Sequence, residues 1–531
     1  MRGIIRREGI LWACLAGLLL TQSEPASAQN TVAEGATGLQ KPAQTMDLAA
    51  AGLLLKELQS QVQELNVEVR TLKQQQESAQ AESAALRAEL EATKSQFATL
   101  SAQPSSITAS SVSSNRSQPQ SSSNDRLSRL EDDQQLTNTR IAEQSQTKVE
   151  SSSKYRVRLN GIVLFNTFVN RGTVENQDFP LLAMPGDALS SDASFGASLR
   201  QSQIGIQGFG PNIAGARTSA DIQFDFAGGF PKTPNGVSFG LVRLRTGTIR
   251  FDWNDTSLIA GQDTLFIAPL SPTSISTLAV PSMAYSGNLW SWTPQIRVEH
   301  RFTVSESSSF LVQGGILDSL SGEVPSEGTY RDATWGESSG QPAYAARISW
   351  TRLMHGQNMT FGVGGYYGRQ YWGLNRSIDS WAGTLDLLLP LTSKLEFTGQ
   401  FYRGKATGGL SGGVGQSVLW NGSLLDPETE LYGLNSLGGW VQLKFKATSK
   451  LQLNGAFGLD NPYANDIRQF GDNSNYYPVP ISKNQTTLLN FLYQPRSDIV
   501  LSLEYRRLKT YTLDSKPDAA NIINLSVGYI F

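Results

Sequence analysis

The sequence predicts an all-β transmembrane barrel of about 16 antiparallel strands, preceded by an α-helical coiled coil. Three observations predict it: the last residues alternate between apolar and small or polar side chains, the first residues are typical of a secretion signal, and long and short linkers alternate between the expected strands. No stretch after the first apolar run is long and apolar enough for a transmembrane helix. A closed sheet is then the remaining way to satisfy every backbone group inside a bilayer.

Composition narrows the chemistry that this chain can support. The 44 Lys and Arg residues balance the 46 Asp and Glu residues, so no overall field points to nucleic acid as a partner. The chain has two histidines and one cysteine, Cys14, which lies in a segment expected to be removed. We therefore expect no disulfide, no metal site, no cofactor and no catalytic residue, and we do not expect an enzyme.

The N-terminal residues, 1–28, are expected to be a signal peptide. Three arginines precede an apolar run over 9–20, and small residues at 26–28 suit cleavage. Residues 29–45 are expected to form a flexible entry to the mature chain. A signal peptide would place everything after it outside the cytoplasm.

Residues 46–101 are expected to form a coiled coil. A heptad register that begins at Leu55 keeps most core positions apolar, and opposite charges such as Glu68 and Lys73 stand five residues apart, as they do between parallel helices. This pattern favours self-association over the alternative, a lone amphipathic helix. The expected core residues are Leu55, Leu58, Val62, Leu65, Val69, Leu72, Leu86 and Leu90.

Residues 102–153 are expected to be a Ser/Gln-rich tether with a short helix, and 154–531 the barrel. Within the barrel, apolar and polar residues alternate over short stretches, as in strands whose two faces differ. We expect strands near 155–169, 197–209, 215–228, 239–252, 257–264, 295–303, 309–318, 342–352, 358–370, 378–390, 394–404, 439–446, 450–459, 485–493, 498–508 and 520–531.

Linker lengths predict the orientation of this barrel. Short turns and long linkers alternate along the chain, so one rim should receive the turns and the other the long loops. In outer-membrane barrels the short turns face the periplasm. An even number of strands would then place both ends of the barrel at the periplasmic rim and the coiled coil in the periplasm.

The final strand is expected to carry a membrane-insertion signal. Its apolar face alternates with small or polar residues such as Asn524 and Ser526. The pattern resembles the C-terminal signal of bacterial outer-membrane proteins, which implies the barrel-assembly machinery as a partner and the outer membrane of a diderm bacterium as the location. The signal residues are Leu525, Val527, Tyr529 and Phe531.

The interior of a sixteen-strand barrel is too wide for wall side chains to fill, so we expect water inside unless a segment narrows it. The candidate constriction is 265–294, which has no charged residue and contains Tyr285, Trp290 and Trp292. Arginines on the wall that faces it could favour anions; alternatively, they are ordinary lining paired with carboxylates. The candidate pore-lining residues are Asp221, Asp225, Arg243, Arg245, Arg297, Glu299, Arg301, Arg347, Glu504 and Arg506.

One short motif adds a family resemblance. Residues 199–205 read Leu-Arg-Gln-Ser-Gln-Ile-Gly, and a strand ending in Asp225 and Phe226 follows. With the order of signal, coil, tether and barrel, this resembles the DcaP-like trimeric porins of outer membranes, although Gln203 stands where that family often has an arginine. The resemblance implies a homotrimer, passive diffusion and a leaning toward negatively charged small solutes.

Two functions from different classes fit these expectations. The first is an outer-membrane porin, a water-filled channel for small hydrophilic solutes, with anion preference as a hypothesis. The alternative is an envelope-spanning structural anchor that tethers the outer membrane to periplasmic or cell-wall components through its coiled coil. Single-channel conductance discriminates between them, because an anchor with a plugged interior conducts no ions.

Overall fold

The computed structural model describes residues 156–531 apart from 190, 231–239, 324–329, 472, 476–478 and 514. The expected signal peptide, flexible entry, coiled coil with its heptad core, and tether lie outside the described residues. Within the described part, no helix is long and apolar enough to cross a membrane.

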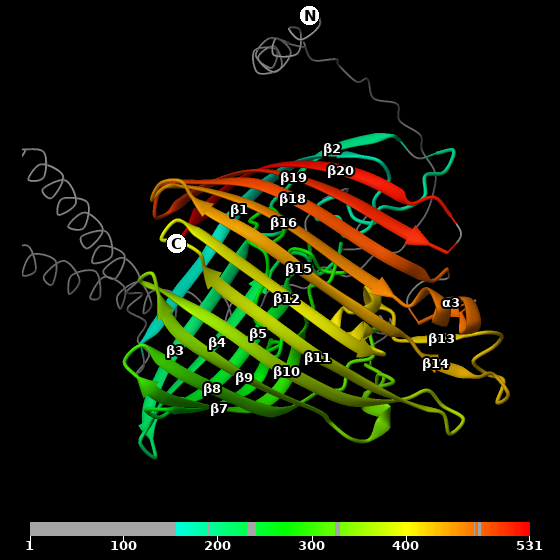
Figure 1. Ribbon diagram of the computed structural model, residues 1–531, viewed down its shortest axis with the longest axis horizontal. Coiled ribbons are helices and arrows are strands. Elements are labelled where there is room, and N and C mark those ends of the chain that lie inside the picture. Colours follow the sequence, from blue (N-terminus) through cyan, green and yellow to red (C-terminus); the bar gives the residue numbers. More distant parts are fainter. Residues whose placement is uncertain are drawn as a thin grey trace, which may run out of the picture. The chain divides into compact units, whose positions relative to one another are not determined.

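A single antiparallel sheet closes on itself, because its first strand β1 pairs with its last strand β20 (Figure 1). Strands β2 and β3 pair with successive stretches of β1, so the 17 strands of this sheet occupy 16 positions in the wall. Each of the sixteen expected strands is found, which confirms the predicted barrel within the described residues. The wall strands are β1 Val157–Arg171, β2 Ala193–Ser198, β3 Gln203–Ile213, β4 Ala216–Asp225, β5 Arg243–Asp252, β6 Thr256–Thr264, β7 Trp292–Ser305, β8 Ser308–Leu317, β9 Ala343–Met354, β10 Gln357–Tyr371, β11 Ser377–Pro390, β12 Leu395–Lys405, β15 Asn435–Lys446, β16 Leu451–Pro462, β18 Ile481–Arg496, β19 Ile499–Thr512 and β20 Asp518–Ile530.

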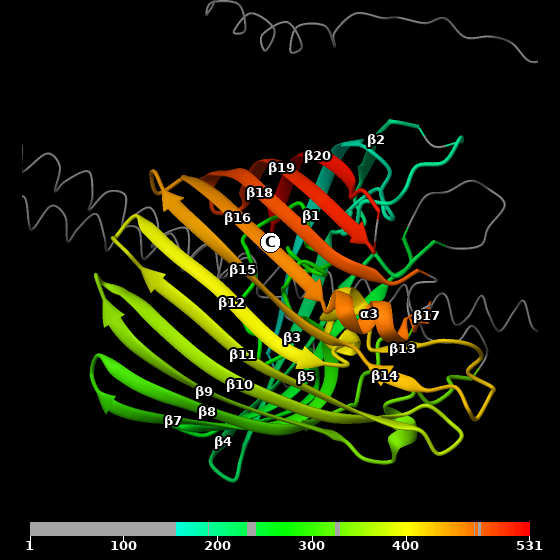
Figure 2. The same cartoon turned by 45° about the vertical axis from the view of Figure 1, so that its right-hand side comes forward.

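Long and short connections alternate between these strands, as the sequence predicts. The segment 509–519 is expected as a long linker but is mostly strand. Strand β19 continues to Thr512 and β20 begins at Asp518, so only 513–517 connect them. At the long-loop end, a small sheet and a short helix pack together (Figure 2). These loop elements are β13 Val418–Trp420, β14 Leu431–Gly433, β17 Asn473–Ser474, helix α3 Ala464–Phe470 and the 3-10 helices Glu337–Ser339, Gly408–Leu410 and Gly413–Gly415.

The two faces of the wall differ in chemistry. On β20, Leu525 is 54% exposed and Tyr529 53% exposed, whereas Asn524 and Ser526 are fully buried. The same alternation of exposed apolar and buried polar side chains runs through β7, β9, β15 and β19. A soluble sheet protein would bury its apolar face, so this sidedness is that of a barrel surrounded by hydrocarbon.

Strand β5 is irregular just before Thr246 and Gly247, where the alternation of residue types along its sequence slips. Opposite β4, Gln223 pairs with Thr246 and Phe224 pairs with Leu244, so Arg245 is the extra residue of a β-bulge. Arg243 and Arg245, two residues apart on one face of β5, both contact Asp225 on β4.

Candidate pore lining and constriction loop

Residues 265–291, between β6 and β7, form a loop that we call the inner loop. The backbone carbonyl of its Ile267 accepts a hydrogen bond from Thr384 Oγ1 on β11 (2.7 Å). At Thr273, the amide donates to Gln442 on β15 (2.6 Å) and the carbonyl accepts from Asn490 on β18 (2.8 Å). The loop therefore reaches strands far from its own two ends.

The next contacts continue along the wall in strand order. Ser274 Oγ donates to Glu504 on β19 (2.6 Å), and the hydroxyl of Ser276 lies 3.0 Å from that of Ser526 on β20. The carbonyls of 278–279 then accept bonds from side chains on β3 and β5. A loop can touch strands all round a closed barrel only from inside it, so the inner loop follows most of the inner wall.

Glycines allow the backbone of the second half of this loop to contact the backbone of the wall. Gly287 has φ +90° and lies directly against the backbone of β15 and β16. A Cβ on Gly438 would lie 3.0 Å from Gly287 Cα, and a Cβ on Gly458 would overlap the Ser286 carbonyl. A side chain at either wall position would therefore push the loop away from the wall.

A cluster of polar side chains, the loop clamp, holds residues 276–279. Its members are Gln201, Gln203, Arg243 and Arg245, all of which donate to backbone carbonyls of this segment. The two arginines share one carboxylate, that of Asp225, at 2.6 and 2.8 Å, and Asp225 is fully buried. Both guanidinium groups also lie over the ring of Trp292, at 4.8 and 4.5 Å from its centre.

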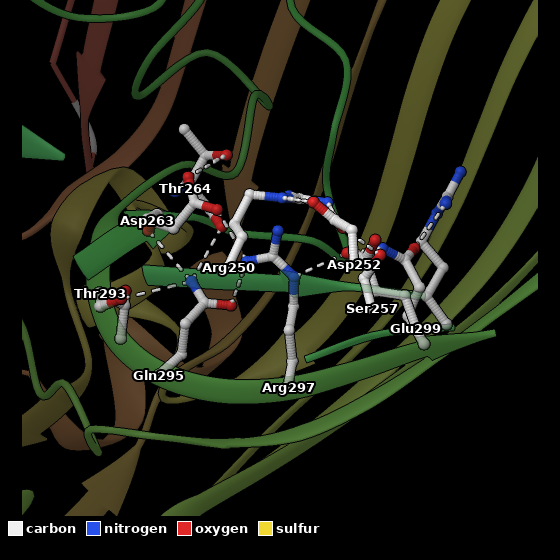
Figure 3. A network of polar contacts seen from close by, with 11 residues as sticks. Arg250, Asp252, Ser257, Asp263, Thr264, Thr293, Gln295, Arg297 and Glu299 are labelled. Carbon is white, nitrogen blue, oxygen red and sulfur yellow. Dashed lines mark hydrogen bonds and ion pairs between the residues drawn. The ribbon is translucent and has the colours of Figure 1, made fainter. Parts of the chain in front are cut away.

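A second group, the charge belt, links side chains of β6, β7, β8, β9 and β11. Arg297 contacts both Asp263 and Glu299 at 2.8 Å (Figure 3). Gln313 donates to Glu299 (2.9 Å) and accepts from Arg347 (3.0 Å). The belt ends at Asp386, which pairs with Arg347 at 2.7 Å.

The charge belt is compensated rather than cationic. Its two arginines stand among three carboxylates, those of Asp263, Glu299 and Asp386. Beside it, Arg250 pairs with Asp252, which also accepts from Ser257 (Figure 3). Paired charges attract mobile ions far less than a cluster of one sign.

The remaining candidate lining residues are dispersed. Asp221 accepts from Thr248 Oγ1 (2.5 Å). Glu504 and Arg506 form a buried ion pair at 3.2 Å on β19. Arg301 is exposed near the turn-side end of β7 and donates to Ser309 (3.4 Å).

The arginines that we expected to gather opposite the loop do not form one group. Arg243 and Arg245 hold the loop itself, and each binds a loop carbonyl. Arg297 and Arg347 are joined through carboxylates and Gln313. The physical reason is that the loop circles the wall instead of folding against one side, so no single facing wall exists.

The aromatic residues of the expected constriction anchor the loop. Tyr285 packs against Leu182, Val414 and Ile481. Trp290 meets Trp292 edge to face, with ring centres 5.3 Å apart. Because β7 begins at Trp292, the loop ends three residues earlier than the expected range of 265–294.

Neither histidine has a setting suited to catalysis. His300 projects from the same face of β7 as Val298 and Phe302, where its ring lies 2.7 Å from Thr256 Oγ1 and meets Phe302 edge to face. His355 lies in a short turn. In the described ranges, no group of three His, Cys, Asp or Glu side chains is placed to hold a metal ion.

Sequence reasoning did not identify several residues that make the interior. Gln201 belongs to the motif of 199–205, but nothing in a neutral amide side chain predicts its hydrogen bond to the Ser276 carbonyl, 75 residues away. Asp386 could have been found from strand parity, because it shares a face of β11 with Ser380 and Thr384, whereas the face of β6 that carries Asp263 also carries Ile259.

Comparison with known proteins gives a fold. No protein-family model and no curated protein matches this chain. Among solved structures, it is similar to the outer membrane channel DcaP of Acinetobacter baumannii, with a TM-score of 0.51 and 16% identity over 72% of this chain and 100% of that one. It is also similar to the anion-selective porin from Comamonas acidovorans (TM-score 0.45, 11% identity, 71% and 100% covered) and to the trimer form of OmpT of Vibrio cholerae (TM-score 0.40, 11% identity, 71% and 100% covered). The described barrel thus has a DcaP-like porin fold.

Proposed function

We propose that this chain is an outer-membrane porin through which small hydrophilic solutes diffuse passively. The observation that carries the proposal is the sidedness of the closed wall, with apolar side chains exposed outside and polar side chains inside. Only a barrel with lipid outside and a wet interior gains stability from that arrangement. Insertion of such a barrel would use the barrel-assembly machinery and outer-membrane lipid.

The proposed solutes are hydrophilic because polar groups dominate the inner face. The inner loop and the wall residues that it contacts carry hydroxyl and carboxylate groups, and the charge belt consists of amide and paired ionic groups. We propose a weak preference for anions at most. The reason is that the loop clamp has a local excess of one positive charge, because Arg243 and Arg245 share the carboxylate of Asp225, whereas the charge belt has one more carboxylate than arginines.

The direct test is electrical recording from the purified full chain in planar bilayers. We expect stepwise conductance increases, and in a trimer groups of three equal closures. A salt gradient should give a reversal potential slightly toward the anion side, and small hydrophilic solutes should reduce the current in proportion to their size. A folded barrel that never conducts would refute the channel, and so would a mature chain that stays monodisperse without detergent.

The alternative role as an envelope anchor rests on the heptads of 46–101 alone. It is compatible with a channel, because the coil and the barrel are separate parts of the chain. Its test is whether deletion of 46–101 loosens the attachment of the outer membrane to the cell wall while conductance per barrel stays the same.

A further inference from the structure

The wall is interrupted at 199–202, between β2 and β3. These residues leave the hydrogen-bond ladder with β1, and a side chain replaces part of it: the Leu164 amide donates to Ser202 Oγ at 2.9 Å. The interruption turns Gln201, which is 1% exposed, toward the inner loop. A break in a membrane-facing strand removes wall hydrogen bonds, so it needs a compensating contact.

Gln201 binds the inner loop with both ends of its side-chain amide. Its Nε2 donates to the Ser276 carbonyl (2.9 Å), and its Oε1 accepts from the Ala279 amide (3.0 Å). One planar side chain therefore binds two backbone groups three residues apart. The contact is buried, where an unmade hydrogen bond costs more than it does in water.

The segment that Gln201 binds is where the inner loop completes its path around the wall. Earlier contacts take the loop from β11 to β20, and the loop clamp fixes it to β3 and β5, next to the strand from which it started. Gln203 and Arg245 both donate to the Leu278 carbonyl, at 3.1 and 2.8 Å.

We propose that Gln201 is a positioning residue that closes the path of the inner loop and thereby sets the aperture of the channel. Arg243 and Arg245 act in the same clamp as ligands of the loop backbone. This inference rests on the proposed channel function for its consequence, the aperture, but not for the contact itself. The chemistry that Gln201 recognises is a segment of its own chain.

Thiol labelling tests the contact without relying on permeation. Thr277 is 3% exposed, so Thr277→Cys in a Cys14→Ala background provides one buried reporter thiol beside the clamp. Gln201→Leu removes both hydrogen bonds at similar volume. We expect the rate of labelling by a water-soluble maleimide to rise on the order of tenfold, because two buried hydrogen bonds hold the segment closed.

The matched control is Gln207→Leu, a glutamine on β3, the strand that begins two residues after Gln201. Its side chain makes no hydrogen bond to residues 265–291, all of which the structure describes, so we expect no change in labelling rate. If Gln201→Leu prevents insertion, Gln201→Glu replaces it as the test variant. It keeps the acceptor for the Ala279 amide and loses the donor to the Ser276 carbonyl. An intermediate rise in the labelling rate supports the proposal. Labelling of the Gln201 variant at the rate of the Gln207 control overturns it.

Conductance then tests the consequence. Gln201→Leu should show a larger or noisier unitary current than the unaltered protein. A cysteine pair, Ser276→Cys with Ser526→Cys, is then added to the Gln201→Leu variant, because the two serine hydroxyls lie 3.0 Å apart. Oxidation to the disulfide should restore the unitary current of the unaltered protein, and reduction should abolish that restoration. An unaltered protein without conductance would refute the channel and leave the labelling result to decide the role of Gln201. A quiet, unchanged current in Gln201→Leu would overturn the link to aperture.

Discussion

At the scale of single residues, one glycine makes a buried ion pair possible. Arg347 on β9 and Asp386 on β11 are separated by β10, and they meet above Gly362 on that strand at 2.7 Å. A Cβ on Gly362 would overlap both charged groups. Breaking a buried pair is costly, because each charge would then lack its partner in a place that water reaches poorly.

We therefore expect Gly362→Ala to destabilise the barrel by roughly 1–3 kcal/mol, the usual cost of overfilling a packed site. The measurement is the free energy of unfolding in urea with detergent or lipid present. Gly365→Ala is the matched control on the same strand, since a Cβ there meets no atom within 4 Å. Equal stabilities for the two variants would contradict this account.

Arg243 contributes to the local excess of positive charge at the loop clamp. Its side chain is 27% exposed, whereas that of Arg245 is 13% exposed, so Arg243 is the more accessible of the two to a passing ion. The substitution Arg243→Gln leaves Arg245 paired with Asp225. We expect the anion-to-cation permeability ratio to fall about twofold, because one unit charge about 8 Å from a passing ion changes its energy by roughly 0.2 kcal/mol in water at about 0.1 M salt, with opposite signs for anions and cations. Reversal potentials in a salt gradient measure it.

Two comparisons separate charge from loop position. Arg243→Lys keeps the charge but not the forked contact, and should retain most of the selectivity. Arg301→Gln removes an exposed arginine at the turn-side end of β7 and should leave the ratio unchanged. An identical ratio in Arg243→Gln and Arg301→Gln would assign no selectivity to the clamp arginine.

At the scale of elements, the loops differ in how they are held. The inner loop is fixed by wall side chains and by glycines that let two backbones touch. Between β8 and β9, the described residues 330–342 include an ionic contact: Arg331 binds Glu337 through two hydrogen bonds of 2.8 Å, and the Thr334 amide donates to the same carboxylate. These contacts lower the pKa of Glu337 to about 2, chiefly through Arg331.

The contribution of Glu337 to this loop should therefore be lost only in strong acid, as the pH falls toward about 2. A carboxyl whose pKa is lowered on folding stabilises the loop above its unfolded value of 4.5, and that contribution is lost as pH falls toward about 2. We expect amide hydrogen exchange around Thr334, corrected for intrinsic rates, to accelerate over this range. Glu337→Gln should remove most of the pH dependence, and unchanged protection down to about pH 2 would rule out the ionic contact as the cause.

At the scale of the whole molecule, the strands could be predicted and the interior could not. Because one face of each strand meets lipid and the other meets polar groups, apolar side chains recur at every second residue. Strand β20 shows this alternation from Ile523 to Tyr529. The bulge at Arg245 was visible for the same reason, as a slip in that period. The bond between Ser274 and Glu504 joins residues 230 apart, and no local pattern encodes such a pairing.

The heptad pattern of 46–101 gives a prediction for assembly of the whole protein. If the heptads over 46–101 join copies of the chain in parallel, deleting them should lower the temperature at which the oligomer dissociates in mild detergent. Barrels from the shortened chain should still run as folded species on unheated gels. Native mass spectrometry counts the subunits, and equal oligomer stability with and without 46–101 would assign assembly to the barrel alone.

The path of the inner loop also bears on the order in which the protein matures. The loop leaves the wall after β6, yet its partners include side chains of β18, β19 and β20, which a ribosome produces last. It can finish its path only after β20 has paired with β1. A half-built sheet would therefore have a vacant centre, and the settling of this loop would be among the final events of biogenesis.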